Sequence, residues 1–303
     1  MNEEFAAIVP DDWKKDLRDN ILAGMVGSPA EKTKAAVKIG YAYKCYAPAS
    51  IFKYFPPNGK RFEAIRDNKL WYSAPSQFND VFDSDFPIDR TSVFNSILSQ
   101  IPNNKGIRKG SPMWRDLQAE MSKSLRQFHG TMDHVRRTTG VACFSESCDS
   151  LLMWAHYAQN HQGICVEYEL LKFSTELNFS PVPIIYSTER ARLSSIEIGN
   201  TEPSSLAFFI GCLTTKSNEW SYENEWRIIR DSGACGKAWN DEKHGALLPS
   251  VTPSSIILGC DTSGQFEKEV CDYCDEKKIN LFKMEKDETE YRLNKKPVKQ
   301  FDT

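Results

Sequence analysis

The sequence predicts one mixed α/β (α+β) domain in which short strands alternate with helices. Three observations support this class. The chain has 303 residues with 40% apolar and 12% aromatic residues, enough core for one large domain or two modest ones. Apolar runs such as 140–145 and 255–259 have the length and composition of buried strands. Helical patterns separate these runs, but few of them form long parallel β-α-β units.

The N-terminal part predicts a helical extension over residues 1–37, with helices at 11–25 and 29–37. The main domain is expected to span residues 38–303. Its first elements are predicted as an aromatic strand at 41–46 and a helix over 48–54.

The middle of the chain predicts a second strand and a helical insertion. Residues 69–73 read as a strand that ends at Ala74-Pro75-Ser76, and residues 77–83 read as a loop anchored by two phenylalanines. Residues 88–136 are mostly helical in pattern, with a break between Pro102 and Pro112. We expect this insertion to form a lid or a helical layer that faces the substrate.

The second half alternates strands and helices up to a charged tail that starts at Lys286. The strands are predicted at 141–145, 163–170, 181–187, 222–230, 255–259 and 280–284, and the helices at 150–160, 204–213 and 266–277.

The composition of the chain limits the classes of partner that it can bind. The formal net charge of −3 argues against a permanent, salt-driven grip on nucleic acid. A local basic patch still allows transient contact with a nucleic-acid substrate; it contains Arg126, His129, His134, Arg136 and Arg137. The acidic start and the absence of a long apolar run predict a soluble, cytoplasmic protein with no membrane partner.

The most unusual segment is the predicted strand at 222–230. Period-2 alternation places Glu223, Glu225 and Arg227 on one side of it. Charges on a strand whose neighbours look buried require a partner, a ligand or water. Glu225 is therefore the first candidate for a functional residue.

Two neighbouring segments carry further candidates. Ser145 ends a predicted strand, where helix capping and a site role are equally expected. Met153, His156 and Tyr157 share one helix face, and the polar tips of His156 and Tyr157 must reach a partner, whereas Met153 is expected in the core.

The sequence predicts no metal site. Cys271 and Cys274 have metal-ligand spacing, but no second pair completes a four-ligand set. Asn79, Asp80 and Asp83 suit a metal or nucleotide cluster, although a rigid turn that supports a neighbouring site is the favoured interpretation.

Four motifs in order resemble a widespread bacterial family known only as a domain of unknown function, and the resemblance covers about residues 40–295. The motifs are Phe78-Asn79-Asp80 with Phe82-Asp83, Cys143-Phe144-Ser145-Glu146, Met153-Trp154-Ala155-His156-Tyr157, and Trp220 to Arg227. One departure is Tyr43-Lys44-Cys45-Tyr46, where the family tends to show Tyr-Lys-Tyr-Arg.

More distantly, the order of the motifs resembles the ADP-ribosyltransferase fold of the diphtheria toxin and PARP type. This resemblance implies a mixed, split β-sheet core, NAD as co-substrate, and Glu225 as the catalytic carboxylate, oriented by Glu223 or Arg227. It implies rings against the nicotinamide from Phe144, Tyr157, Trp71 or Tyr72. Further NAD-binding candidates are Tyr43, Lys44, Ser73, Asn79, Ser145 and His156. At the first motif, Tyr43 and Lys44 replace the usual His or Arg.

The chemistry implied is cleavage of the nicotinamide–ribose bond through an oxocarbenium-like state that a nearby carboxylate stabilises. The acceptor is expected to be protein, nucleic acid or water. Such bacterial enzymes are often toxins or antiviral effectors, so an antitoxin or immunity protein is an expected partner.

Two other hypotheses stay open. In one, the chain is a non-catalytic interaction module of a defence system, and Glu223, Glu225 and Arg227 form a structural ion-pair ladder. In the other, it is a magnesium-dependent nuclease that uses Asp80, Asp83 and Glu146.

Overall fold

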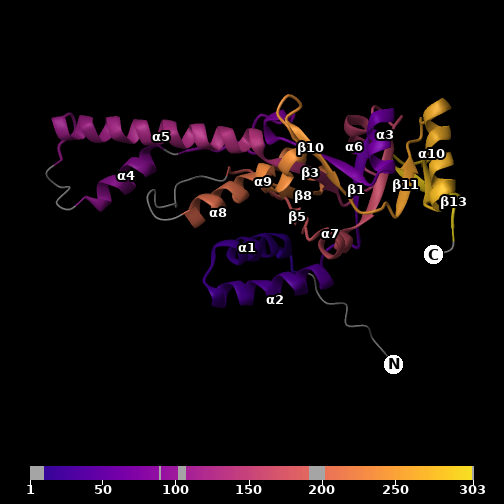
Figure 1. Ribbon diagram of the computed structural model, residues 1–303, viewed down its shortest axis with the longest axis horizontal. Helices are drawn as coiled ribbons and strands as arrows, with labels where there is room; N and C mark the ends of the chain where they lie inside the picture. Colours follow the sequence, from indigo (N-terminus) through magenta and orange to yellow (C-terminus); the bar gives the residue numbers. More distant parts are fainter. Residues whose placement is uncertain (1–9, 89, 102–106, 191–201, 302–303) are drawn as a thin grey trace.

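The computed structural model describes residues 10–88, 90–101, 107–190 and 202–301 (Figure 1). Its centre is an eleven-stranded sheet with the order β13-β12-β11-β4-β1-β3-β2-β10-β9; in addition, β8 pairs with β3, and β5 pairs with β8. The strands are β1 (Ser50–Phe55), β2 (Lys69–Ser73), β3 (Gly140–Ser145), β4 (Ile164–Glu169), β5 (Val182–Pro183), β8 (Glu225–Arg230), β9 (Trp239–Asn240), β10 (Gly245–Pro249), β11 (Ser255–Leu258), β12 (Asn280–Lys286) and β13 (Leu293–Lys299).

The sheet is mixed, because β11 and β12 are parallel while the other pairs are antiparallel. A separate parallel pair joins β6 (Ile185–Ser187) and β7 (Thr215–Ser217). The helices are α1 (Trp13–Val26), α2 (Pro29–Cys45), α3 (Gly59–Arg66), α4 (Arg90–Gln100), α5 (Pro112–Thr138), α6 (Leu151–Tyr157), α7 (Leu170–Leu177), α8 (Glu202–Leu213), α9 (Ser232–Cys235) and α10 (Gly264–Lys277). The predicted mixed α/β class is confirmed.

The sheet forks at β3. One edge of β3 pairs with β8 over all six residues, from Gly140 opposite Arg230 to Ser145 opposite Glu225. The other edge meets β1 only at Ser145 and β2 only at Val141. The strands β1 and β2 therefore diverge from opposite ends of one edge, and the sheet is split between them.

The register of β8 on β3 decides which side chains face the fork. Directly opposite residues share a face of an antiparallel pair, so Arg227 lies beside Cys143 and Glu225 beside Ser145. Phe144 and Trp226 point to the other face, where both are fully buried in the main core. The predicted sharing of one face by Glu225 and Arg227 is confirmed.

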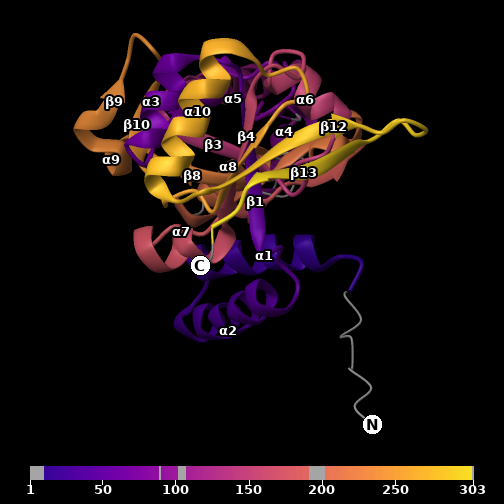
Figure 2. The same ribbon diagram turned by 90° about the vertical axis from the view of Figure 1, so that its right-hand side faces the viewer.

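The helices α1 and α2 lie below this core face in both views (Figures 1 and 2). A capping box between Ser28 and Glu31, with Pro29 in the first turn, starts α2. The helix continues to Cys45, so the predicted strand at 41–46 is wrong. Tyr43 is buried beside Trp226 and donates its hydroxyl to the Pro181 carbonyl. Tertiary packing has overridden the strand preference of the tyrosines.

One other prediction is also wrong. Residues 48–54 form no helix, because β1 starts at Ser50. Within the charged tail, Leu293–Lys299 forms the edge strand β13, and Figure 2 shows the β12–β13 hairpin extending from the body. Lysines and a proline are typical of edge strands, because they discourage further pairing.

The helices α4 and α5 form an arm that projects from the body (Figure 1). A small apolar cluster of Phe86, Met132, Phe208 and Cys212 holds its base against α8. Within the described residues, no helix has the length and apolar character needed to cross a membrane.

Candidate active site

A cleft of about 780 Å³ lies at the fork of the sheet. Its walls come from β1, β2, β3 and β10. We call five of its charged residues, all buried, the charged floor; they are Asp83, Lys216, Glu223, Glu225 and Arg227. We call four cationic residues on its outer wall the basic rim; they are Lys60, Arg61, Lys69 and Lys243.

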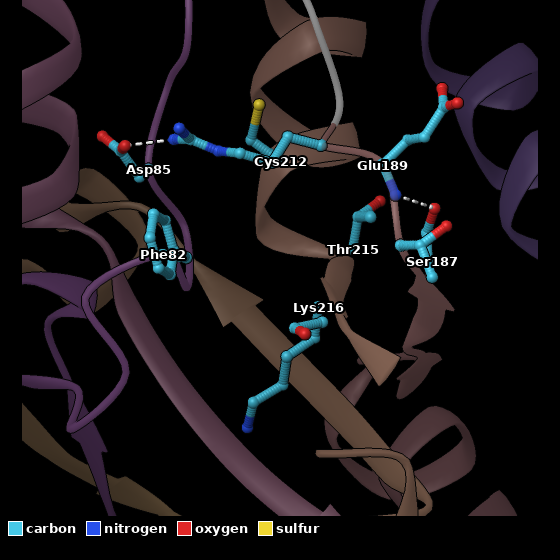
Figure 3. Close-up of a pocket in the computed structure, with 10 residues that line it drawn as sticks. Phe82, Asp85, Ser187, Glu189, Cys212, Thr215 and Lys216 are labelled. Carbon is cyan, nitrogen blue, oxygen red and sulfur yellow. Dashed lines mark hydrogen bonds and ion pairs between the residues drawn. The ribbon is translucent and has the colours of Figure 1, made fainter. Parts of the chain in front are cut away.

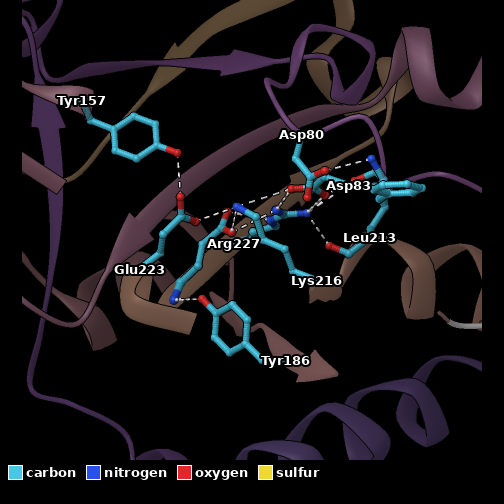
Figure 4. A network of polar contacts seen from close by, with 11 residues as sticks. Asp80, Asp83, Tyr157, Tyr186, Leu213, Lys216, Glu223 and Arg227 are labelled. Atoms are coloured by element: carbon cyan, nitrogen blue, oxygen red, sulfur yellow. Dashed lines mark hydrogen bonds and ion pairs between the residues drawn. The ribbon is translucent and has the colours of Figure 1, made fainter. Parts of the chain in front are cut away.

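Arg227 is the centre of the charged floor and is 0% exposed. Glu225 binds it from one side, at 2.7 Å to Nε and 3.0 Å to Nη2, and Asp83 binds it from the other, at 2.9 Å to Nη1 and 2.6 Å to Nη2. The Leu213 carbonyl accepts from Nη1 at 2.8 Å (Figure 4). A guanidinium has five N–H donors, and these five contacts use them all. Arg227 therefore fixes two carboxylates and has no donor left for a ligand.

Lys216 joins the two glutamates of the floor. Its ammonium donates to Glu223 at 2.6 Å and to Glu225 at 3.1 Å. The second Glu223 oxygen accepts from the Tyr157 hydroxyl at 2.6 Å (Figure 4). Tyr157 is half-buried and lines the cleft together with Glu223.

A local turn makes this arrangement possible. Residues Asn218–Glu223 form a 3-10 helix (η3), so the predicted strand at 222–230 starts only at Glu225. Asn224 has φ 44°, in the left-handed region that asparagine tolerates, and it turns η3 into β8. Ser145 donates its hydroxyl to the Glu223 carbonyl at 2.6 Å and so ties η3 to β3. Ser145 thus has a positioning role.

The two glutamates have pKa values shifted in opposite directions. Burial alone raises the pKa of Glu225, but Arg227 and Lys216 outweigh it and hold that pKa well below the ordinary 4.5. Burial, followed by repulsion from Glu225, raises the pKa of Glu223 above 4.5 despite Lys216. Carboxyl groups whose pKa values are pushed apart are typical of acid–base pairs in active sites. With three carboxylates and two cations, the fully ionised floor carries a net charge of −1.

The outer part of the cleft has a different character. Trp71 is 37% exposed and lies opposite Leu247 in the β2–β10 pair, so both side chains form one apolar surface. Within the described residues, Lys60, Arg61 and Lys243 make no ion pair with another side chain. Lys53 also lines the cleft; it donates to the Cys143 carbonyl at 2.8 Å, and burial lowers its pKa.

Most of the predicted site residues line this cleft. They are Trp71, Ser73, Asn79, Phe144, Ser145, Tyr157, Glu223, Glu225 and Arg227. The Phe144 ring, however, is 2% exposed and packs against Tyr168 and Phe173, so stacking on a ligand is not supported for it.

Four predicted residues lie elsewhere. Tyr43 and Lys44 belong to α2, on the far side of the sheet from the cleft. Tyr72 is fully buried in the main core, because neighbouring strand residues face opposite sides and Trp71 takes the cleft side. His156 is exposed on α6 and does not line the cleft.

Sequence reasoning missed Lys216 and Lys53. It favoured a turn role for Asp83, with a metal or nucleotide role as the alternative, and did not pair Asp83 with Arg227. Lys216 follows an apolar helix with no distinguishing pattern, and Asp83 contacts a residue 144 positions away. The one signal in the sequence was that a buried arginine such as Arg227 requires a carboxylate partner, which indicates a further acidic residue but not its position.

The three carboxylates of the nuclease hypothesis are not gathered into one site. Asp83 faces Arg227, while Glu146 accepts from Trp226 Nε1 at 2.6 Å and pairs with Lys14 at 2.6 Å. Among the residues that the structure describes, no three His, Cys, Asp or Glu side chains are grouped so as to hold a metal ion.

A second, smaller cavity of about 240 Å³ lies on the other side of β7. Ser187, Thr215 and Asp85 are among its lining residues (Figure 3), and Asp85 forms an ion pair with Arg190. Lys216 lines both cavities, since its backbone belongs to β7 and its ammonium reaches the charged floor.

Comparison with protein families gives a match for part of the chain. The sequence model of a family described as "Protein of unknown function (DUF2971)" matches residues 153–228. No curated protein and no solved structure matches the chain. The matched segment contains Tyr157, Lys216, Glu223, Glu225 and Arg227, so four of the five residues of the charged floor fall within it. Over this segment, the chain is similar to a family of unknown function, in agreement with the first predicted resemblance.

Proposed function

We propose that the chain is an NAD-consuming ADP-ribosyltransferase and that the cleft at the fork binds NAD. One observation carries the proposal. A single cleft combines two carboxyl groups of opposite pKa shift at its buried end with an exposed tryptophan and unpaired cations at its outer end. NAD has the matching polarity, with a cationic nicotinamide riboside at one end and a pyrophosphate and adenine toward the other.

The cleft suits NAD in this orientation. Its volume lies within the range of pockets that hold small ligands and cofactors. The nicotinamide riboside would lie over the charged floor, whose net negative charge favours a cation. The pyrophosphate would meet the basic rim, and the adenine would stack on Trp71 beside Leu247.

The reaction at the floor breaks the bond between ribose C1′ and nicotinamide nitrogen. The electron pair leaves with nicotinamide and neutralises its ring, while positive charge develops on the ribose. The acceptor forms a new bond to C1′ and loses a proton. Glu225, kept ionised by Arg227 and Lys216, supplies fixed negative charge near the developing cation.

Glu223 receives the proton that the acceptor loses, and the Tyr157 hydroxyl relays it. Both Glu225 oxygens are bound by Arg227 and one also by Lys216, whereas Glu223 has an oxygen whose partner is the Tyr157 hydroxyl. The acceptor would donate its proton to the phenol oxygen as the phenol donates its own to Glu223. A carboxylate with a raised pKa accepts a proton more readily than an ordinary one.

The test is release of nicotinamide from NAD, with transfer of label from NAD to separate protein, DNA and RNA fractions. The variant Glu223→Gln keeps the shape of the side chain and removes the base, so we expect release to fall by at least about 100-fold. Tyr157→Phe should also lower release, while the exposed control Lys295→Gln should not. Absence of nicotinamide release by the wild-type chain in every fraction would contradict the proposal.

A second candidate is a non-catalytic interaction module, and the saturated hydrogen bonding of Arg227 favours it. In this case the floor is a structural ion-pair cluster. The two candidates separate in one comparison: a module keeps its cellular activity in a folded Glu223→Gln variant, whereas an enzyme loses it.

A further inference from the structure

We infer that the arm formed by α4 and α5 is a docking surface for nucleic acid. We further infer that nucleic acid is therefore the acceptor of the reaction, a second step that rests on the proposed function, whereas the docking itself does not.

Charge is segregated between the arm and the rest of the chain. The described residues of the arm, 90–101 and 107–138, contain eight Lys and Arg but three Asp and Glu, a net charge of +5. Since the whole chain carries −3, the remaining residues carry −8. A positive element on a negative body attracts polyanions locally without making the whole protein basic.

The cations of α5 are arranged along one side of the helix. Arg115, Arg126 and Arg137 recur every eleven residues, which is close to three turns, so they align parallel to the helix axis. With 27 residues, α5 is about 40 Å long. The three arginines are exposed, while Leu125 and Met132 are buried on another side.

Few of these charges are neutralised within the arm. The ion pairs on α5 join Lys123 to Glu120 and Arg137 to Asp133, and all four side chains are more than half exposed. Arg115 and Arg126 form no ion pair with another described residue. Exposed cations of this kind contribute little to folding and remain available for phosphates.

The composition of the exposed face favours nucleic acid over an acidic protein. Protein interfaces are usually built around a buried apolar or aromatic centre. On the described part of α5, Met113 is the large apolar side chain that is exposed. A row of arginines over a long distance with so little apolar surface fits a phosphate backbone better.

The arm also leads toward the cleft. The helix α5 contacts the short turn Pro75–Gln77, and the next two residues, Phe78 and Asn79, line the cleft. A nucleic-acid strand that follows α5 toward this turn would reach the cleft, which also carries the cations of the basic rim.

The test is fluorescence anisotropy of labelled single-stranded DNA, single-stranded RNA and duplex DNA with the full chain, between 50 and 200 mM salt. We expect binding that weakens steeply with salt. The variant Arg115→Glu/Arg126→Glu should bind at least about tenfold more weakly, with a salt slope reduced by about two. The control Lys32→Glu/Lys34→Glu, an equal charge change on exposed residues of α2, should bind as the wild type does.

Three outcomes would overturn the docking proposal: no binding at 50 mM salt, equal weakening in the control, or displacement of the oligonucleotide by polyglutamate at equal charge. Nicotinamide release without added acceptor, measured on the same variants, separates this proposal from the proposed function. If the arm variant loses oligonucleotide binding in an enzyme that releases no nicotinamide, docking stands and the transferase fails. If release occurs and no oligonucleotide binds, docking fails alone.

Discussion

The charged floor and the arm use ionic side chains in opposite ways. In the floor, Arg227 and Lys216 are buried and each is held by carboxylates. On the arm, Arg115 and Arg126 are exposed and have no described acidic partner. Buried charges must be satisfied internally, whereas exposed cations add little to folding and can be used for binding. The buried charges of the floor therefore hold the site in shape, whereas the exposed arginines of the arm are available to bind a ligand.

The largest expected effect is the loss of Arg227. Arg227→Met removes the guanidinium that binds Asp83 and Glu225 and leaves two buried carboxylates with Lys216 as their remaining cation, so we expect the free energy of unfolding to fall by about 3–5 kcal/mol. Urea unfolding measures it. The matched control Arg115→Met on the arm should change stability by less than about 0.5 kcal/mol. Equal losses in the two variants would remove the distinction between floor and arm.

The next effect separates the two glutamates. A carboxyl whose pKa is lowered by folding stabilises the fold above its unfolded pKa, near 4.5, and that contribution is lost as pH falls. Glu225→Gln should therefore cost about 1.5–3 kcal/mol at pH 7, and the difference from the wild type should shrink below about pH 4.5.

The contribution of Glu223 to stability changes with pH in the opposite direction. Its raised pKa stabilises the fold at low pH, and this contribution is lost as pH rises through the folded pKa. Glu223→Gln should therefore be as stable as the wild type at pH 7, or more stable. Chemical unfolding between pH 4 and pH 8 checks both variants, and the same pH dependence for the two would show that the assignment is wrong.

Some strands of the fold and part of the candidate site can be predicted from the sequence, and others cannot. The strands at 140–145, 255–259 and 280–284 are identifiable from sequence, because their apolar runs are buried and their ends are marked by turn residues. The site face of β8 follows from simple alternation of Glu225 and Arg227.

Long-range contacts and overridden local preferences were not predictable. Tyr43 looks like a strand residue but lies in a helix because its ring packs on Trp226. The left-handed Asn224, which carries Glu223 to the cleft from outside the strand, has no signal in the local alternation. Asp83 binds Arg227, whereas Lys216 binds Glu223 and Glu225. Asp83 and Lys216 come from two separate segments, and only the fold brings them into the charged floor.

A smaller effect distinguishes two adjacent aromatic residues of β2. Trp71→Ala should weaken NAD binding about fivefold by loss of stacking worth about 1 kcal/mol. Tyr72→Phe should leave NAD binding unchanged, because Tyr72 faces the core and its buried hydroxyl has no hydrogen-bond partner among the residues that the structure describes. Titration calorimetry measures both. Weaker NAD binding in the Tyr72→Phe variant would mean that NAD contacts the core face of β2 instead of the cleft face that carries Trp71.

The smallest effect is expected at the basic rim. Lys60→Ala/Lys243→Ala should raise the KM for NAD two- to fourfold at 50 mM salt, with little effect at 500 mM, because exposed charges are screened. Steady-state kinetics at the two salt concentrations would show it. An effect of equal size at both concentrations would mean that the lysines act through packing rather than charge.

The most direct test is a crystal structure of the Tyr157→Phe variant with NAD. We expect the nicotinamide riboside over the charged floor, with C1′ beside Glu223 and Glu225, and the adenine on Trp71. Electron density for NAD outside the fork, a reversed orientation, or no binding at millimolar NAD would contradict it.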